Sequence, residues 1–317
     1  MKFSVHSFGS WNFLTLSLAL LFALPFFSLI VTAGSGGENV WGHLLSTVMP
    51  GYLKNTFWLM LGVGSGTLLL GVSTGWLISM TEFPGRRMME WALLLPLAFP
   101  GYIIAMVYVE LLEFSGPVQE QLRLWFGWQN YMDYWFPPIA SLGGAITMLS
   151  LVLFPYVYLL ARTAFLQQSA TLMEASRMLD KSAVNSFFMI ALPLARPAIV
   201  VGVSLAMMET LADFGTMQLF AVQTFTTGIY NTWFGAYNAP GAAQLSLSLL
   251  TFISFFIFLE RYSRKQQRFN TQSSIKNVHT RYHLSGVRAV LALLFCIFPV
   301  LFGFALPAGL LIQWATE

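Results

Sequence analysis

The stretch QQSATLMEASRMLDKSAVNSFFMIALPLARP, residues 167–197, is a polar segment between two strongly apolar blocks. Apolar residues recur in it at the spacing of a helix face: Leu172, Ala175, Met178 and Leu179. A second apolar face is predicted from Phe187, Phe188 and Ile190. The pattern predicts two short amphipathic helices with a break near Asp180, followed by a new helix launched at Pro193 and Pro197. Such an apolar ridge is typical of a docking surface.

The composition is that of a membrane protein. Hydrophobic residues make up 56% of the chain and charged residues only 9%, whereas a soluble domain carries about 25% charge. The one cysteine, Cys296, lies in an apolar run and cannot form an internal disulfide. No nucleic-acid motif, phosphate-binding glycine loop or His/Cys metal spacing is present in the sequence. We therefore expect no cofactor, no fixed metal and no nucleic-acid partner.

Seven apolar segments are long enough to cross a bilayer, which predicts an all-α membrane protein. They are expected at residues 13–33, 55–80, 91–112, 139–161, 198–220, 242–259 and 289–314. The first segment has about 20 residues, which exceeds the roughly 7–15 of a signal peptide and favours an uncleaved anchor. Pro96 and Pro100 lie inside the third segment, where neighbouring groups can satisfy the freed carbonyls.

The lysines and arginines predict the orientation. If the amino terminus is cytoplasmic, all of the 16 basic residues except Lys54 and Arg123 fall on the cytoplasmic side. This follows the positive-inside rule and explains the net charge of +3 without an anionic ligand. The expected location is a membrane crossed several times, with residues 261–288 as a basic cytoplasmic linker.

The start of the last span resembles the start of the first. The string LALLF occurs at 18–22 and again at 291–295, and a proline follows each copy, at Pro25 and Pro299. We read the chain as one repeat plus the first helix of a second, so that either the chain continues past Glu317 or two chains pair. The predicted regions are 1–52 (first helix and periplasmic loop), 53–260 (core), 261–288 (linker) and 289–317 (first helix of a second repeat).

Within the opening stretch, seven residues match the spacing of a known motif: Glu174, Ala175, Ser176, Asp180, Ile190, Leu192 and Pro193. They resemble the cytoplasmic loop E-A-A-x3-G-x9-I-x-L-P of bacterial ABC-importer permeases. Ser176 replaces the second alanine and Asp180 replaces the glycine. Aspartate occupies a left-handed turn less readily than glycine does, so the turn geometry differs from the family pattern.

This resemblance implies a type I ABC importer transmembrane bundle in the bacterial inner membrane. A dimer of cytoplasmic ATPase subunits would receive the loop 167–197, with Glu174 as an ionic anchor and Leu179 as an apolar knob. The chain itself would not be an enzyme, because hydrolysis would belong to the ATPase. An ordinary amphipathic segment at the membrane surface is the alternative reading of the loop.

Two further strings resemble the iron(III) permeases: ETLADFGT at 209–216 and TFTTGIY at 224–230. The resemblance implies ferric iron as cargo, delivered by a periplasmic ferric-binding protein. Permeases for thiamine, polyamines and sulfate share the general loop, so these solutes remain alternatives.

Three acidic residues lie within or near the predicted spans: Glu110, Glu209 and Asp213. A carboxylate in a bilayer costs about 2.5–3.5 kcal/mol on insertion scales and usually faces protein or water. Glu209 and Asp213 are four residues apart, which predicts one helix face, and Fe(III) prefers oxygen ligands. Either these residues line the translocation path, or they are structural and hold neighbouring helices or a helix end.

Two other classes of function remain to be distinguished. An ion-driven secondary carrier would use buried carboxylates and no ATPase, but the loop spacing argues against it. A membrane-embedded enzyme would need a catalytic or metal cluster, whereas His6, His43, His279 and His283 are scattered over a terminus, a loop and the linker.

Overall fold

The computed structural model describes residues 10–35, 42, 46–168, 183–264 and 281–316. The chain forms two compact units, one built from Met1–Leu53 and Phe225–Lys265 and the other from Lys54–Thr224 and Gln266–Glu317. Six described helical segments are long and apolar enough to cross a membrane, and Ala239–Phe255 is a shorter apolar helix. The prediction of an all-α membrane protein with about seven spans is therefore confirmed.

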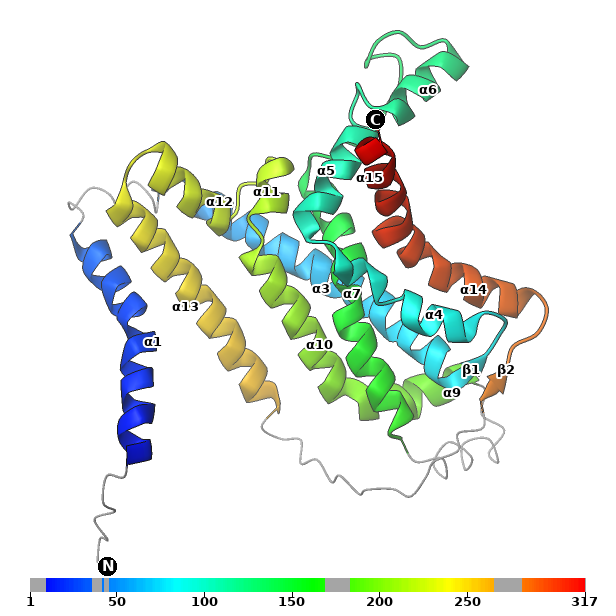
Figure 1. Ribbon diagram of the computed structural model, residues 1–317, viewed down its shortest axis with the longest axis horizontal. Helices are drawn as coiled ribbons and strands as arrows, with labels where there is room; N and C mark the ends of the chain where they lie inside the picture. Colours follow the sequence, from blue (N-terminus) through cyan, green and yellow to red (C-terminus); the bar gives the residue numbers. More distant parts are fainter. Residues whose placement is uncertain (1–9, 36–41, 43–45, 169–182, 265–280, 317) are drawn as a thin grey trace, which may run out of the picture. The chain divides into compact units, whose positions relative to one another are not determined.

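The larger unit is organised around helix α7 (Leu142–Leu166), which packs along α10 (Leu192–Ala212) (Figure 1). Helix α3 (Met49–Met80) crosses α7 through glycines. A methyl group at Gly62 would lie 2.6 Å from Ile146 Cδ1, and one at Gly71 would lie 2.8 Å from the backbone nitrogen of Tyr158. The missing side chains thus let two apolar helices approach closely, which is the packing expected between helices in lipid.

Short elements complete the end of this unit where Arg86 and Arg162 lie, which we call the basic end. Strand β1 (Thr81–Glu82) pairs in parallel with β2 (Tyr282–His283), so that Thr81 is opposite Tyr282. The other short elements of the unit are α4 (Arg86–Ala92), η1 (Leu95–Ala98), α5 (Gly101–Leu112), α6 (Pro117–Phe126), α9 (Ala183–Ser186), η2 (Phe187–Ala191) and α11 (Gly215–Leu219).

The segment after the linker continues from β2 into α14 (Val287–Val300), η4 (Leu301–Ala305) and α15 (Leu306–Thr316). Figure 1 shows it, in orange and red, running from β1 towards α5. Ala292 and Cys296 are buried against Phe154 and Tyr158 of α7. At the other end the hydroxyl of Tyr108 donates to the carbonyl of Phe302 at 2.6 Å. The segment is therefore an integral layer of the larger unit.

The smaller unit pairs α1 (Ser10–Gly34) with α13 (Ala239–Arg264), and it also holds α12 (Phe225–Tyr230) and η3 (Asn231–Gly235). The buried amide of Gln244 donates to the carbonyl of Ala33 at 3.0 Å. Tyr52 and Phe225 are both buried and their rings tilt against each other at 6.2 Å. Gly228 leaves room for the Tyr52 ring, because a methyl group there would overlap it.

Two predicted spans differ from the structure. The third, expected as one helix over 91–112, is broken at Leu93 and again at Phe99. Pro100 forces the preceding residue into an extended conformation, and Phe99 has φ −105° and ψ 134°. The fifth span, expected over 198–220, begins at Leu192 and ends at Ala212, since Pro193 is tolerated in a first helical turn.

Candidate functional site

The structure describes only the two arms of the segment 167–197. Five of the motif residues lie outside the described residues: Glu174, Ala175, Ser176, Leu179 and Asp180. Ile190 lies in the π-helical turn η2, and Leu192 and Pro193 begin α10. We call residues 165–168 and 183–193 the coupling arms, after the role that the resemblance implies.

The coupling arms are fastened to each other and to the core. The buried side chain of Gln168 donates from Nε2 to the carbonyl of Ala191 at 2.8 Å. Ile190 and Leu192 pack against a buried cluster that includes Ala161 and Phe165 of α7. The arms of the loop are therefore anchored on α7 and α10.

The predicted second apolar face of the segment is divided. Phe187 and Ile190 turn towards the core, whereas Phe188 is 61% exposed. Successive residues of a helix point about 100° apart, so Phe188 cannot share the inward face of Phe187. The large exposed apolar residues of this arm are Val184, Phe188 and Met189.

Trp76 of α3 lies where both arms meet the segment after the linker. Its ring centroid lies 5.5 Å from that of Phe165, 5.0 Å from that of Phe187 and 6.5 Å from that of Tyr282. The Phe165 contact is edge to face, a favoured geometry for aromatic pairs. We call these four residues the Trp76 cluster.

A chain of ion pairs crosses the basic end beside this cluster. Arg281 pairs with Glu82 at 3.4 Å, and Glu82 pairs with Arg86 at 3.3 Å. Arg86 is buried and reaches Glu90 at 3.4 Å, and Glu90 also pairs with Arg162. The hydroxyl of Tyr158 donates to the backbone carbonyl of Glu90 at 2.9 Å. The chain thus joins the residue before β2 to β1, α4 and α7.

The three acidic residues singled out from the sequence do not gather at one place that the structure shows. Glu209 is exposed near the end of α10, and Glu110 is exposed on α5. Glu110 lines a cleft of about 600 Å³ with Met106, Leu111, Pro117, Leu310, Gln313 and Trp314. No group of three His, Cys, Asp or Glu that could hold a metal occurs among the described residues.

Asp213 has a structural role at the point where α10 ends. Its carboxylate accepts hydrogen bonds from the backbone nitrogen of Thr216 at 2.7 Å and from the Thr216 hydroxyl at 2.8 Å. A methyl group at Gly101 would lie 3.0 Å from the same carboxylate. Asp213 therefore holds the first turn of α11 near the start of α5. A path-lining role for Glu209, Asp213 and Glu110 stays a prediction, and so does the structural alternative.

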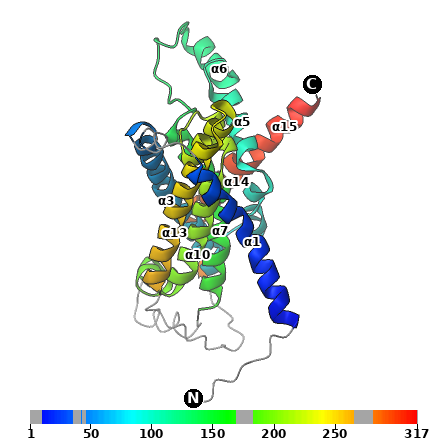
Figure 2. The same ribbon diagram turned by 90° about the vertical axis from the view of Figure 1, so that its left-hand side faces the viewer.

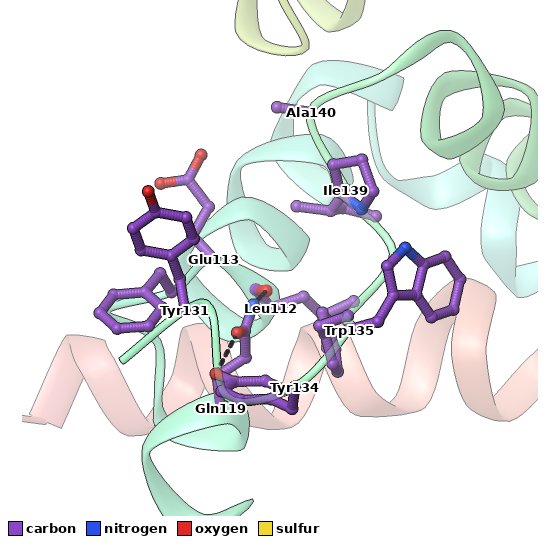
Figure 3. Close-up of a pocket in the computed structure, with 11 residues that line it drawn as sticks. Leu112, Glu113, Gln119, Tyr131, Tyr134, Trp135, Ile139 and Ala140 are labelled. Carbon is purple, nitrogen blue, oxygen red and sulfur yellow. Dashed lines mark hydrogen bonds between the residues drawn. The ribbon is translucent and has the colours of Figure 1, made fainter. Parts of the chain in front are cut away.

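Helix α6 and the chain around it lie beyond α5 (Figure 2), at the end of the larger unit opposite the basic end (Figure 1). This segment between α5 and α7 carries several packed aromatic residues. The Tyr134 hydroxyl donates to Gln119 Oε1 at 2.6 Å, and Gln119 donates to the carbonyl of Leu112 at 2.7 Å. Trp128 stacks on Tyr134 with a centroid distance of 4.6 Å. A cavity of about 390 Å³ is lined by Gln119 and Tyr134 together with Glu113, Tyr131 and Trp135 (Figure 3).

A carboxylate stabilises the turn in this layer. Asp133 accepts hydrogen bonds from the backbone nitrogens of Gln129 and Asn130 at 2.7 and 2.8 Å. These bonds favour the charged form and lower the pKa of Asp133. The Gln119–Tyr134 network was not predictable from the sequence, because hydrogen-bond partners 15 residues apart leave no periodic signal.

Comparison with known proteins decides the family. The model of the binding-protein-dependent transport system inner membrane component matches residues 67–268, which include the whole segment 167–197. The chain belongs to this family. The predicted resemblance to ABC-importer permeases is therefore confirmed.

The individual relatives are named for the transport of different solutes. An Fe(3+)-transport system permease protein, FbpB 2 of Haemophilus influenzae, is 27% identical over 95% of this chain, and the chain spans 55% of its length. The molybdenum transport permease ModB of Escherichia coli is 29% identical over 63% of this chain and 88% of its own. A solved bacterial alginate ABC transporter, in complex with a periplasmic protein, has a subunit with TM-score 0.63 and 16% identity, covering 83% of this chain and 96% of its own. At that identity it shows the fold alone.

Proposed function

We propose that the protein is the permease subunit of an ATP-driven importer, in which the segment 167–197 receives a cytoplasmic ATPase. The observation that carries this proposal is the family match over residues 67–268, combined with the complete motif spacing from Glu174 to Pro193. The described arms support it, because they tie the loop to α7 and α10 by a buried hydrogen bond and apolar packing. The permease performs no catalysis of its own in this scheme.

The basic end is the cytoplasmic end in this proposal, and the amino terminus is cytoplasmic. The clustering of arginines at one end of the larger unit supports this orientation. Residues 289–316 represent the first helix of a second repeat, as their sequence likeness to residues 18–25 indicates.

Ferric iron, delivered by a periplasmic binding protein, is the proposed cargo. The support is the alignment of 95% of this chain with a ferric permease, together with the strings at 209–216 and 224–230. An oxyanion is the second candidate, because ModB matches at a similar identity. Uptake of radiolabelled Fe(III) and of radiolabelled molybdate into cells expressing the native operon distinguishes the two. Uptake of molybdate without Fe(III) would refute the ferric assignment while keeping the importer.

The test of the importer itself is co-purification. The full chain, purified from membranes with its neighbouring ATPase gene expressed, should retain the ATPase, and the complex should hydrolyse ATP. A permease that carries its cargo with no associated ATPase and follows an ion gradient would instead be a secondary carrier.

A further inference from the structure

The Trp76 cluster joins three parts of the chain that lie far apart in sequence. Phe165 lies in the last turn of α7, Phe187 lies in η2 on the other coupling arm, and Tyr282 belongs to β2 after the linker. Phe165 is fully buried, and its ring lies 6.3 Å from that of Phe187. A displacement of either coupling arm therefore changes what Trp76 contacts.

Tyr282 cannot follow such a displacement alone, because β2 is fastened to the end of α3. Thr81 pairs with Tyr282 in the parallel ladder, and the backbone nitrogen of Leu284 donates to the carbonyl of Glu82 at 3.0 Å. Arg281 donates to the carbonyl of Ser79 at 3.3 Å and also pairs with Glu82. A shift of Trp76 and Tyr282 is thus passed to the segment 281–316 as a body.

The cluster has space to move on one side. An open hollow of about 270 Å³ on the surface of the unit is lined by Ser73, Trp76, Leu77, Phe187 and Phe295. Phe295 belongs to α14. Trp76, Phe187 of the coupling arm and Phe295 of the segment 281–316 therefore all border the same hollow.

The segment 281–316 reaches the opposite end of the unit. There Phe302 accepts the hydrogen bond of Tyr108, and Leu310, Gln313 and Trp314 form one wall of the cleft that holds Glu110. A rigid shift of the segment would change the width of this cleft. The contacts along the segment form a continuous packed route between the two ends of the unit.

We propose that Trp76 is a positioning residue that transmits the position of the coupling arms, through Tyr282 and the segment 281–316, to the cleft at Glu110. This inference rests on the proposed function, because it requires an ATPase that moves the arms. In this proposal the segment after the linker has two roles. It packs as a layer of the larger unit, and it transmits the position of the coupling arms from one end of the unit to the other.

The test measures the cleft directly and needs no knowledge of the cargo. Gln313→Cys, in a Cys296→Ala background, is labelled with a maleimide in proteoliposomes that hold the full chain and its ATPase, with and without ATP and vanadate. We expect trapping to change the labelling rate by about fivefold, the lower range of typical coupling between sites. Trp76→Leu should abolish the change while the ATPase stays bound and hydrolyses ATP, and Trp76→Phe should keep most of it.

Two further variants separate transmission from simple loss of packing. Trp91→Leu, which removes a 73% exposed tryptophan at the same end of the unit, is the matched control and should behave as the parent. Tyr282→Leu should also abolish the change, and the double variant with Trp76→Leu should be no worse than either one, because both lie on one route.

Four results bear against the proposal. An unchanged labelling response in Trp76→Leu would overturn it. Loss of bound ATPase in the same proportion as loss of the labelling response would also overturn it. Effects of Trp76→Leu and Tyr282→Leu on the labelling response that multiply in the double variant would also overturn it. A parent complex that retains no ATPase would refute the proposed function itself, and this is visible before any variant is measured.

Discussion

Substitution of glycine by alanine at two positions of α3 should give opposite results, although the chemical change is the same. A methyl group at Gly71 would lie 2.8 Å from the backbone nitrogen of Tyr158 and 2.9 Å from the carbonyl oxygen of Phe154. Neither atom can move without displacing α7. At Gly64 the nearest atom is the sulfur of Met207 at 3.5 Å, an ordinary contact with a flexible side chain.

The magnitudes follow from two opposed effects. Alanine in a helix interior is favoured over glycine by roughly 0.5–1 kcal/mol, so Gly64→Ala should be neutral or slightly stabilising. Overpacking costs about 1–3 kcal/mol, so Gly71→Ala should lose up to about 2 kcal/mol net. At about 2–4 °C per kcal/mol for a large domain, this lowers the thermal midpoint by up to about 8 °C.

The assay is thermal unfolding of the detergent-solubilised full chain, followed by the size-exclusion peak that survives heating. Gly64→Ala is the control for helix propensity and for handling. Equal midpoints for the two variants would refute the account of α3 and α7 as helices brought together by missing side chains.

Three other outcomes are expected. Glu90→Gln removes the charged partner of Arg86 and Arg162 and should cost about 1.5–3 kcal/mol of stability, the range for a hydrogen bond to a charged group. The exposed control Glu120→Gln should leave the thermal midpoint unchanged, and equal midpoints for the two variants would count against the ion-pair chain. Because hydrogen bonds lower the pKa of Asp133, its turn should be stable at neutral pH and should be lost as the pH falls through the lowered pKa. A fluorescence titration checks this: the emission of neighbouring Trp128 should change on acidification in the parent and not in Asp133→Asn. Ser274→Cys should react with an impermeant thiol reagent only from the cytoplasm, and labelling in intact cells would reverse the proposed orientation.

The long apolar helices were predictable, because a continuous apolar run of this length forms a membrane-spanning helix. Helix α7 was expected over 139–161 and is found over Leu142–Leu166, where Ser141 accepts a hydrogen bond from the backbone nitrogen of Gly144 at the helix start. The breaks around Pro96 and Pro100 were not predicted, because a proline in a membrane helix is compatible with both a kink and a break. Packing of α4 and η1 against α14 accompanies the break.

The candidate site was predicted as a motif and not as a set of contacts. The spacing from Glu174 to Pro193 is readable in the sequence, and so is the apolar character of Phe187. The meeting of Trp76 with Tyr282 was not readable, nor was the pairing of Arg281 with Glu82, because these partners are about 200 residues apart. Contacts between segments so distant arise from the tertiary arrangement, which local periodicity does not encode.

The central claim is that the segment 167–197 holds an ATPase, and the most direct measurement is the amount of ATPase retained by the purified full chain and by two variants. Glu174→Ala removes the proposed ionic anchor and Leu179→Asp places a charge on the proposed apolar knob. Truncating one partner of a buried interfacial charge pair costs about 2–5 kcal/mol, which weakens binding more than tenfold. Both variants should insert normally, because these positions lie outside the predicted spans, and both should lose the ATPase and uptake. Wild-type ATPase binding and uptake in both variants would contradict the account.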